Sequence, residues 1–266
     1  MDKTVKILDY GELGLIDIMG SDDAIVEAAR VSYGKGTKQV SSNRSLIRYL
    51  MRHQHWGPFE MAEMKFYVKL PIFVARQWVR HRTASINEIS GRYSEFDMSE
   101  VYRPTTFRKQ SQDNKQGSSD SCFSYEIQSY DKSQTEYSIL LNKGAAKELA
   151  RIVLPVSSYT QWYWKCDLRN IFNFLRLRLD FHAQYEIRMY AQAMAKMVKE
   201  SFPLAYEAFE DYILNSVTFN GSELRYINWD IVDGGYKVTI DFEKAKEELG
   251  KRELNELRMK LRHVAQ

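Results

Sequence analysis

The sequence has little cysteine, little proline and no long apolar run. Among its 266 residues are two cysteines, Cys122 and Cys166, and five prolines. Two cysteines cannot build a disulfide framework, which favours an intracellular protein. Neither has a neighbouring histidine or basic cluster that would mark a nucleophile, and Cys166 is expected to pack in the core. No apolar run reaches the roughly 18 residues of a membrane-spanning helix, and no signal peptide is visible, so we expect a cytoplasmic protein without a membrane partner.

A large charge of either sign is also absent. The chain has 38 Lys and Arg against 35 Asp and Glu, a net charge of +3. So small an excess does not indicate a general nucleic-acid-binding protein, and no nucleic-acid partner is expected. Hydrophobic residues make up 44% and charged residues 27%, which excludes wholesale disorder.

Several catalytic motifs are missing as well. There is no GxxxxGK[ST] loop and no HExxH, and the GKG at 34–36 lacks the third glycine of a dinucleotide-binding loop. The pairs His53/His55 and His182/Glu186 stand without an accompanying cluster of ligands. We therefore expect no metal site.

The hydrophobic pattern mixes helices and strands without a regular βαβ rhythm, which predicts an α+β fold. Alternating apolar residues predict a strand over 64–70, and residues 157–166 are β-prone. Residues 83–94 have no clear period and are expected to form a loop or a strand. Helices are predicted over 43–54, 71–82, 126–152 and 182–200, and after a cap at Asp167.

Two segments differ from the rest of the chain. Residues 108–121, RKQSQDNKQGSSDS, contain no aliphatic side chain, which predicts an exposed loop or insertion. The tail has a possible strand followed by two helical stretches with a break at Gly250. We divide the chain into a domain over 1–220, with the insertion near 108–121, and an extension over 221–266.

The most informative segment is RHRTASINEISGRY at 80–93. Arginine forks match phosphate oxygens, and Asn, Glu and Ser side chains can read the edges of a heterocycle. The run Ser90-Gly91-Arg92 offers backbone N–H groups beside a cation, which suits a phosphate. The triplet RHR alone could equally be a solvated basic helix end.

This segment resembles the signature of flavin-dependent thymidylate synthases, which is RHR, seven residues and then Ser. Other blocks resemble the same family in the same order, namely PIFVARQWVRHR, SGRYS, ARIVLP and DLRNIFNFLRLRLDFHAQYEIR. The resemblance covers about residues 5–215. Gly57 and Met61 depart from it, because members often carry a small hydroxyl residue and a histidine there.

The resemblance implies helices around an antiparallel sheet, assembled as a homotetramer whose active sites span subunits. It implies a methyltransferase that converts deoxyuridylate (dUMP) to thymidylate (dTMP). Methylenetetrahydrofolate would give the carbon, and FAD reduced by NADPH would give the hydride, with no cysteine nucleophile.

Site residues follow from the same resemblance. Arg178, against the uracil, is the catalytic candidate. The dUMP-binding candidates are Gln77, Arg80, Glu88, Ser90, Gly91, Arg92, Arg151 and Arg178. The FAD-binding candidates are His55, Gly57, Arg80, His81, Arg82, Glu88, Asp167, Leu168, Arg169 and Asn173.

Physical reasoning supports some of these roles. Uracil C5 is a poor nucleophile until negative charge builds on the ring, and a fixed guanidinium stabilises that charge. Arg178 flanks the apolar stripe of its helix, between core and solvent, although an arginine there could instead snorkel or form an interface salt bridge. The helix N-terminus at 167–169 is expected to offer unpaired N–H groups to the FAD pyrophosphate. Ser90 has no adjacent base, so we assign it to phosphate binding.

Two other functions remain open from the sequence. The arginines and aromatic residues could serve a nucleic-acid-binding module, or the chain could bind flavin without synthase activity. A colourless protein would favour the first alternative, and a yellow protein that releases no tritium from C5-labelled deoxyuridylate would favour the second.

Overall fold

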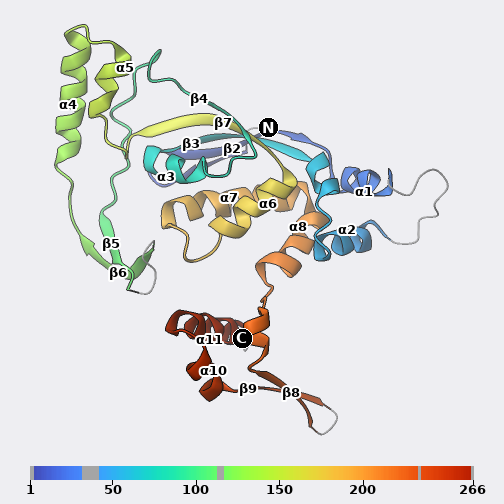
Figure 1. Ribbon diagram of the computed structural model, residues 1–266. Helices are drawn as coiled ribbons and strands as arrows, with labels where there is room; N and C mark the ends of the chain where they lie inside the picture. Colours follow the sequence, from blue (N-terminus) through green and yellow to red (C-terminus); the bar gives the residue numbers. More distant parts are fainter. Residues whose placement is uncertain (1–2, 32–41, 113–116, 233–234, 265–266) are drawn as a thin grey trace. The chain divides into compact units, whose positions relative to one another are not determined.

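The computed structural model describes residues 3–31, 42–112, 117–232 and 235–264 (Figure 1). It divides into two compact units, Met1–Glu210 and Asp211–Gln266. Among the described residues, no helix is both long enough and apolar enough to cross a membrane.

The first unit is built on a five-stranded sheet with the order β1-β2-β3-β7-β4. Every neighbouring pair of its strands is antiparallel. The strands are β1 (Lys3–Ile7), β2 (Gly11–Met19), β3 (Glu63–Pro71), β4 (Ser85–Glu88) and β7 (Tyr159–Asp167). This arrangement confirms the α+β class and the antiparallel sheet.

The sheet buries one face because its central strands alternate. On β3, Met64, Phe66, Val68 and Leu70 are all fully buried, as the predicted strand over 64–70 requires. Three helices cover that face, namely α3 (Ile72–Trp78), α6 (Leu168–Arg178) and α7 (Tyr185–Ser201) (Figure 1). The functional residues on these helices are therefore held against a rigid surface.

An aromatic cluster at Trp78 joins the covering helices to the sheet. Its ring centroid lies 5.6 Å from that of Trp164 on β7, 4.5 Å from Phe174 on α6 and 6.0 Å from Tyr190 on α7. Such edge and tilted contacts are favourable for aromatic pairs. The end of α3 is therefore fixed against α6, which places residues 79–83 beside the last turns of α6.

A second group of helices lies at the other end of the unit. It consists of α1 (Asp22–Val31), α2 (Asn43–Arg52), the 3₁₀ turn η1 (Gly57–Met61) and α8 (Pro203–Phe209). The Asp22 carboxylate accepts hydrogen bonds from Leu204 N at 2.8 Å and Ala205 N at 3.0 Å. An early helix thus satisfies the first N–H groups of α8.

The described residues of 106–153 form an arm of a hairpin and short helices, where a loop and a single long helix were predicted. The arm contains the hairpin β5 (Thr106–Gln110) and β6 (Ser118–Ser124), then α4 (Ser129–Asn142), α5 (Lys147–Ala150) and the short turn η2 (Arg151–Val153). The loop prediction is wrong for residues 108–110 and 118–121, which lie in the strands because Phe107 stacks on Phe123 across them, just outside the polar interval. Residues 113–116 of the predicted loop lie outside the described residues, and none of its described residues is buried, as predicted. The helix prediction over 126–152 is wrong in its middle, since Gly144 adopts a φ of +80° that ends α4.

Other element boundaries also moved. The helix predicted over 71–82 ends at Trp78, which leaves the RHR triplet outside regular helix. The unassigned segment 83–94 contributes the edge strand β4 and then a turn.

The second unit is a small module with its own core. Tyr226, Ala245, Leu254 and Leu257 form that core. Lys260 Nζ lies 2.7 and 2.6 Å from the two carboxylate oxygens of the buried Glu223. The elements are the π-helical turn η3 (Glu210–Leu214) at the division, α9 (Gly221–Leu224), β8 (Ile227–Val232), β9 (Gly235–Ile240), α10 (Phe242–Glu248) and α11 (Lys251–Val264).

Truncation of the central tryptophan tests this account of the core. Trp78→Ala is expected to lower the free energy of unfolding by about 3–5 kcal/mol, because it removes a fully buried ring. Trp78→Phe is expected to cost less, since no described residue accepts from the indole Nε1. Urea titration measures both, with Val31→Ala, on an 80% exposed residue, as the control. A loss no larger than the control's would contradict the central role of Trp78.

Candidate active site

The end of α3 and the last turn of α6 bring a histidine against an arginine. Arg178 Nε donates to His81 Nε2 at 3.0 Å, and Arg178 Nη2 reaches the main-chain oxygen of Gln77 at 3.4 Å. The His81 ring also packs on Phe174, with centroids 4.9 Å apart. The two contacts use Nε and Nη2 and fix the guanidinium plane, while Nη1 donates to no described residue.

Burial sets the protonation of this pair. Burial first, and the Arg178 charge second, lower the pKa of His81 from 6.5 to about 4. The ring is therefore neutral near pH 7, and its Nε2 can accept from Arg178 only in that form. Burial also lowers the pKa of Arg178, which is half-buried as its position on the helix predicted. An arginine nevertheless keeps its charge.

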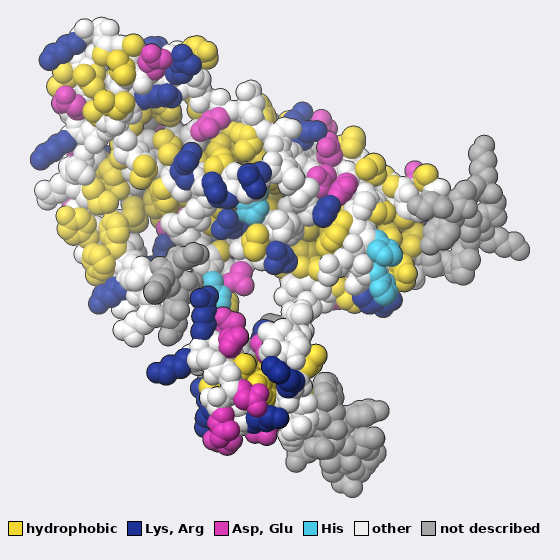
Figure 2. All heavy atoms as spheres, in the orientation of Figure 1, with side chains coloured by type: hydrophobic (Ala, Val, Ile, Leu, Met, Phe, Trp, Pro, Cys, Tyr) yellow, Lys and Arg dark blue, Asp and Glu magenta, His cyan; other side chains and the backbone are white. Residues whose placement is uncertain are grey.

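A cavity of about 220 Å³ opens beside the pair. Five of the predicted residues line it, namely Arg80, His81, Arg82, Asn173 and Arg178. Gln77 does not line the cavity, but its main-chain oxygen contacts Arg178, which does. Figure 2 shows Lys and Arg side chains gathered around a histidine over the region of α3 and α6. The donor set is cationic and polar, which suits anionic oxygens.

A second cavity of about 540 Å³ lies at the start of α6 and shares Thr83, Cys166 and Asn170 with the first. Asp167 and Arg169 line it. The second cavity also has the carboxylates of Glu60, Glu63 and Asp167 in its lining, so the arginines and amides of the first cavity are the donors that best fit a phosphate.

The helix end itself is less open than predicted. Asp167 caps it, accepting from Asn170 N at 2.9 Å, and Leu168 N donates to Ala62 O at 2.8 Å. Leu168 is also fully buried. The expectation of unpaired N–H groups over 167–169 is therefore wrong at position 168. The neighbouring side chains are also engaged, since Arg169 Nη1 pairs with Glu60 and Asn170 Nδ2 donates to Asp167 Oδ2 at 2.7 Å.

The residues predicted to bind phosphate form a turn elsewhere in the same unit. Ser90 O accepts from the amides of Tyr93 and Ser94, at 3.1 and 3.0 Å, which closes a turn over 90–94. Gly91 is required there, because a Cβ would lie 2.3 Å from the Phe96 ring and 3.3 Å from Arg151 Cδ. The turn thus brings Ser90, Gly91 and Arg151 together, with Arg92 next to them.

Three further candidates line neither of these two cavities. Glu88, at the end of β4, accepts from Thr160 Oγ1 at 2.5 Å. His55 belongs to a ring cluster with Tyr49 and His53, its centroid 5.8 Å from Tyr49 and 6.1 Å from His53. Gly57 has open space where a Cβ would be, so packing would also allow the small hydroxyl residue that family members often carry there.

One chain does not bring all the predicted residues together. Arg80, His81 and Arg178 lie at the ends of α3 and α6, whereas Ser90–Arg92 and Arg151 form a separate group beside α5. Figure 1 shows α5 well apart from α3 and α6. The candidate dUMP site is therefore split into two groups within the chain.

The structure confirms that Cys166 is a packing residue. It is 3% exposed, its thiol donates to Thr83 O at 3.2 Å, and burial raises its pKa far above the usual value. A thiol held in this way is not a nucleophile.

Sequence reasoning missed three polar residues near the site. Asn170 lines both cavities, and the sequence signal was its position three residues before Asn173, on the same helix face. Gln184 and Glu186 contact each other at 2.8 Å beside Gln77, which no local pattern indicated. The helix predicted over 182–200 begins only at Tyr185, so His182 lies outside the helix that carries Glu186.

Comparisons with known proteins agree with this arrangement. Residues 14–204 match the family described as thymidylate synthase complementing protein. The chain is 52% identical over 252 residues to a flavin-dependent thymidylate synthase of Thermus thermophilus, covering 93% of this chain and 91% of the relative. It is 49% identical over 262 residues to one from Wolbachia pipientis wMel, covering 95% and 90%.

Solved structures give the same relationship. The UMP/dUMP methylase PolB of Streptomyces cacaoi, bound with 5-bromo-UMP, superposes with a TM-score of 0.65 at 33% identity. That match covers 79% of this chain and 97% of the methylase. On its sequence, its fold and its relatives, the chain belongs to the flavin-dependent thymidylate synthase family.

Proposed function

We propose that this protein methylates deoxyuridylate to thymidylate, with carbon from methylenetetrahydrofolate and a hydride from FAD reduced by NADPH. The thymidylate synthase activity and the flavin follow from the family. The folate and NADPH are our extension of it. A neighbour solved with 5-bromo-dUMP, at 35% identity, supports a pyrimidine nucleotide as substrate.

The observation that carries the proposal is the oriented, half-buried guanidinium of Arg178. The carbon at uracil C5 attacks only when negative charge develops on the ring. A guanidinium whose plane is fixed in advance, and which is partly shielded from water, stabilises that charge without reorganising. His81 supports this role because a neutral acceptor holds Nε–H without adding a second positive charge.

The remaining arginines suit the rest of the nucleotide. We assign Ser90, Gly91, Arg92 and Arg151 to the phosphate. The turn over 90–94 and the close packing of Gly91 against Arg151 support this assignment, because they keep these residues near one another. Arg80 lies beside Arg178 in the first cavity and would bind dUMP and FAD where they meet. Glu88 would likewise lie where dUMP and FAD meet.

The two cavities along α6 would hold the flavin nucleotide. The side chains of Arg82, Arg169 and Asn173 would bind its phosphates, with His81 near the ring system. His55 and Gly57 are further proposed contacts, from the end of α2 and from η1. When bound, the reduced flavin would supply the hydride. The protein's own contribution is to hold the nucleotide beside it and keep the charge of Arg178 in place.

We propose that the active enzyme is a homotetramer with active sites shared between subunits. The split of the arginines supports this, because α5 and α6 lie apart within one chain while the reaction needs both groups at one nucleotide. Closed assemblies of identical chains repeat such a pairing at every site.

We also propose that residues 1–220 form the synthase domain and 221–266 an extension. The family match ends at residue 204, and the division between the compact units falls after Glu210. Both observations support placing the catalytic machinery in the first part.

Replacement of Arg178 by lysine tests the proposed function. Arg178→Lys is expected to lower kcat by about 100-fold or more, because a point charge cannot replace the planar fork. The protein is expected to remain folded and yellow. Tritium release from C5-labelled deoxyuridylate measures turnover, and flavin absorbance measures cofactor content.

A matched control is Arg188→Lys on α7, where the guanidinium donates to Phe181 O at 2.9 Å. That variant is expected to keep its turnover. Near-normal tritium release by Arg178→Lys would refute the role of Arg178 at the uracil.

A pH titration tests the neutral state of His81. Between pH 4 and 6.5 the unfolded chain binds a proton at this histidine and the folded chain does not, so the free energy of unfolding rises with pH. His81→Asn keeps an acceptor but removes the titration, and is expected to reduce that slope by up to about one proton. Urea titrations between pH 4.5 and 6.5 measure both proteins. Identical slopes would contradict a depressed pKa.

A further inference from the structure

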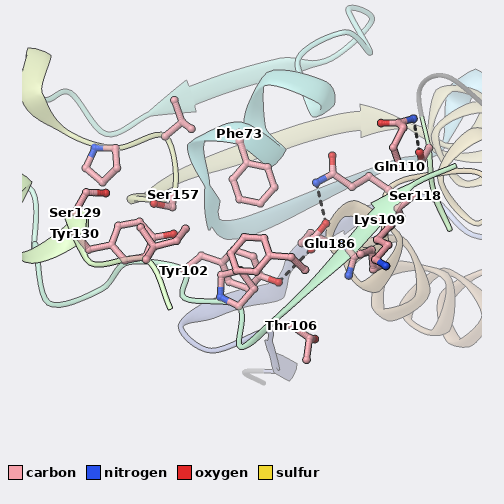
Figure 3. A pocket seen from close by; sticks show the side chains of 18 residues that line it. Phe73, Tyr102, Thr106, Lys109, Gln110, Ser118, Ser129, Tyr130, Ser157 and Glu186 are labelled. Carbon is pink, nitrogen blue, oxygen red and sulfur yellow. Dashed lines mark hydrogen bonds and ion pairs between the residues drawn. The ribbon is translucent and has the colours of Figure 1, made fainter. Parts of the chain in front are cut away.

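A buried carboxylate anchors the arm to the first turn of α7. Glu186 is 3% exposed. One of its oxygens accepts from Arg108 Nη2 at 2.6 Å. The same oxygen accepts from Tyr102 OH at 3.1 Å (Figure 3). Arg108 comes from β5, and its guanidinium also lies 5.0 Å from the centroid of the Tyr185 ring. These contacts fill one side of the carboxylate.

The other oxygen of Glu186 leads toward the candidate active site. It accepts from Gln184 Nε2 at 2.8 Å. Gln184 Oε1 in turn accepts from Gln77 Nε2. The main-chain oxygen of Gln77 is the group that Arg178 Nη2 contacts at 3.4 Å. A continuous row of hydrogen bonds therefore runs from the arm to the end of α3.

The chemistry of these groups sets the direction of every bond in the row. An ionised carboxylate can only accept, so the Gln184 atom that faces it must be the NH₂ group. Its carbonyl oxygen must then face Gln77, and that oxygen can also only accept. Gln77 is consequently obliged to present its own NH₂ group to Gln184.

Glu186 remains the acceptor at neutral pH. Burial alone would raise its pKa, but the hydrogen bonds from Arg108, its own backbone amide and Gln184, with the Arg108 charge, hold the pKa below its ordinary value. Removing the carboxylate would free both amides to turn over.

We propose that Glu186 and Gln184 are positioning residues that turn the side-chain oxygen of Gln77, Oε1, toward the bound nucleotide as a hydrogen-bond acceptor. The inference rests on the proposed function, in which Gln77 contacts deoxyuridylate. No described residue donates to this oxygen. Phosphate oxygens carry no proton to offer at neutral pH. Gln77 therefore takes an N–H or O–H donor, either the uracil N3–H or a deoxyribose hydroxyl, and not the phosphate.

Binding of three nucleotides to the flavin-loaded enzyme tests this inference. The probes are dUMP, N3-methyl-dUMP, which lacks the imide donor, and 2′,3′-dideoxyuridylate, which lacks the sugar donor. Calorimetry gives each dissociation constant. Wild type is expected to bind one analogue about tenfold more weakly than dUMP, because an acceptor is left unpaired. The weaker analogue identifies the donor.

Variants connect that discrimination to the row of hydrogen bonds. Gln184→Met and Glu186→Gln are expected to raise the KM for dUMP about tenfold, leave kcat within about twofold, and remove most of the analogue's penalty. Gln77→Met is expected to do the same, and combining it with Gln184→Met to add little more. Gln184 is only half-buried, so its variant keeps the test available if Glu186→Gln fails to fold.

The matched control breaks another ion pair at the base of the arm. Arg103 Nη2 lies 3.0 Å from Asp131, with both side chains exposed, and Arg103→Met is expected to leave KM unchanged. Equal binding of all three nucleotides by wild type would overturn the acceptor role. A normal KM in Gln184→Met, with a raised one in Gln77→Met, would overturn the row of hydrogen bonds alone. A normal KM in Gln77→Met would instead refute its place in the proposed site.

Discussion

The proposed chemistry depends on the contact between Arg178 and a histidine that carries no charge. A guanidinium that moves freely in water stabilises a developing anion only weakly, because solvent must rearrange around it. Here His81 accepts its Nε–H, and Phe174 packs against the histidine ring. Phe174 also packs on Trp78, so the sheet's aromatic core sets where the two helix ends meet. The same aromatic contacts therefore stabilise the core and orient the arginine.

The division of the other arginines follows from the topology. Strand β4 leads away from α3, so Ser90–Arg92 join Arg151 beside α5 instead of returning to Arg178. Collecting all the guanidinium groups in one chain would also concentrate positive charge without a ligand to balance it. The shared site that we propose would bring the groups around the nucleotide only when the assembly forms.

The sequence predicted what local chemistry encodes. Alternation predicted the strand over 64–70, and the cap at Asp167 predicted the start of α6. The RHR triplet at 80–82 supplied three of the residues that line the first cavity. Contacts between residues that are distant in the sequence could not be predicted in this way. Phe107 and Phe123 turn a polar interval into a hairpin, and Ala62 takes an amide of α6 that we expected to be free. The roles that we propose for Gln184 and Glu186 depend on contacts such as that of Arg108, which the arm brings to Glu186.

Complementation between inactive subunits tests the shared site most directly. Chains carrying Arg178→Lys and chains carrying Arg151→Ala, each with its own affinity tag, are co-expressed, and assemblies retaining both tags are assayed for thymidylate formation. Random mixing makes about one quarter of the sites wild type, because each takes its two arginine groups from different chains. The account predicts that activity returns toward that level while either variant alone stays inactive. Mixed assemblies as inactive as their parents would contradict it.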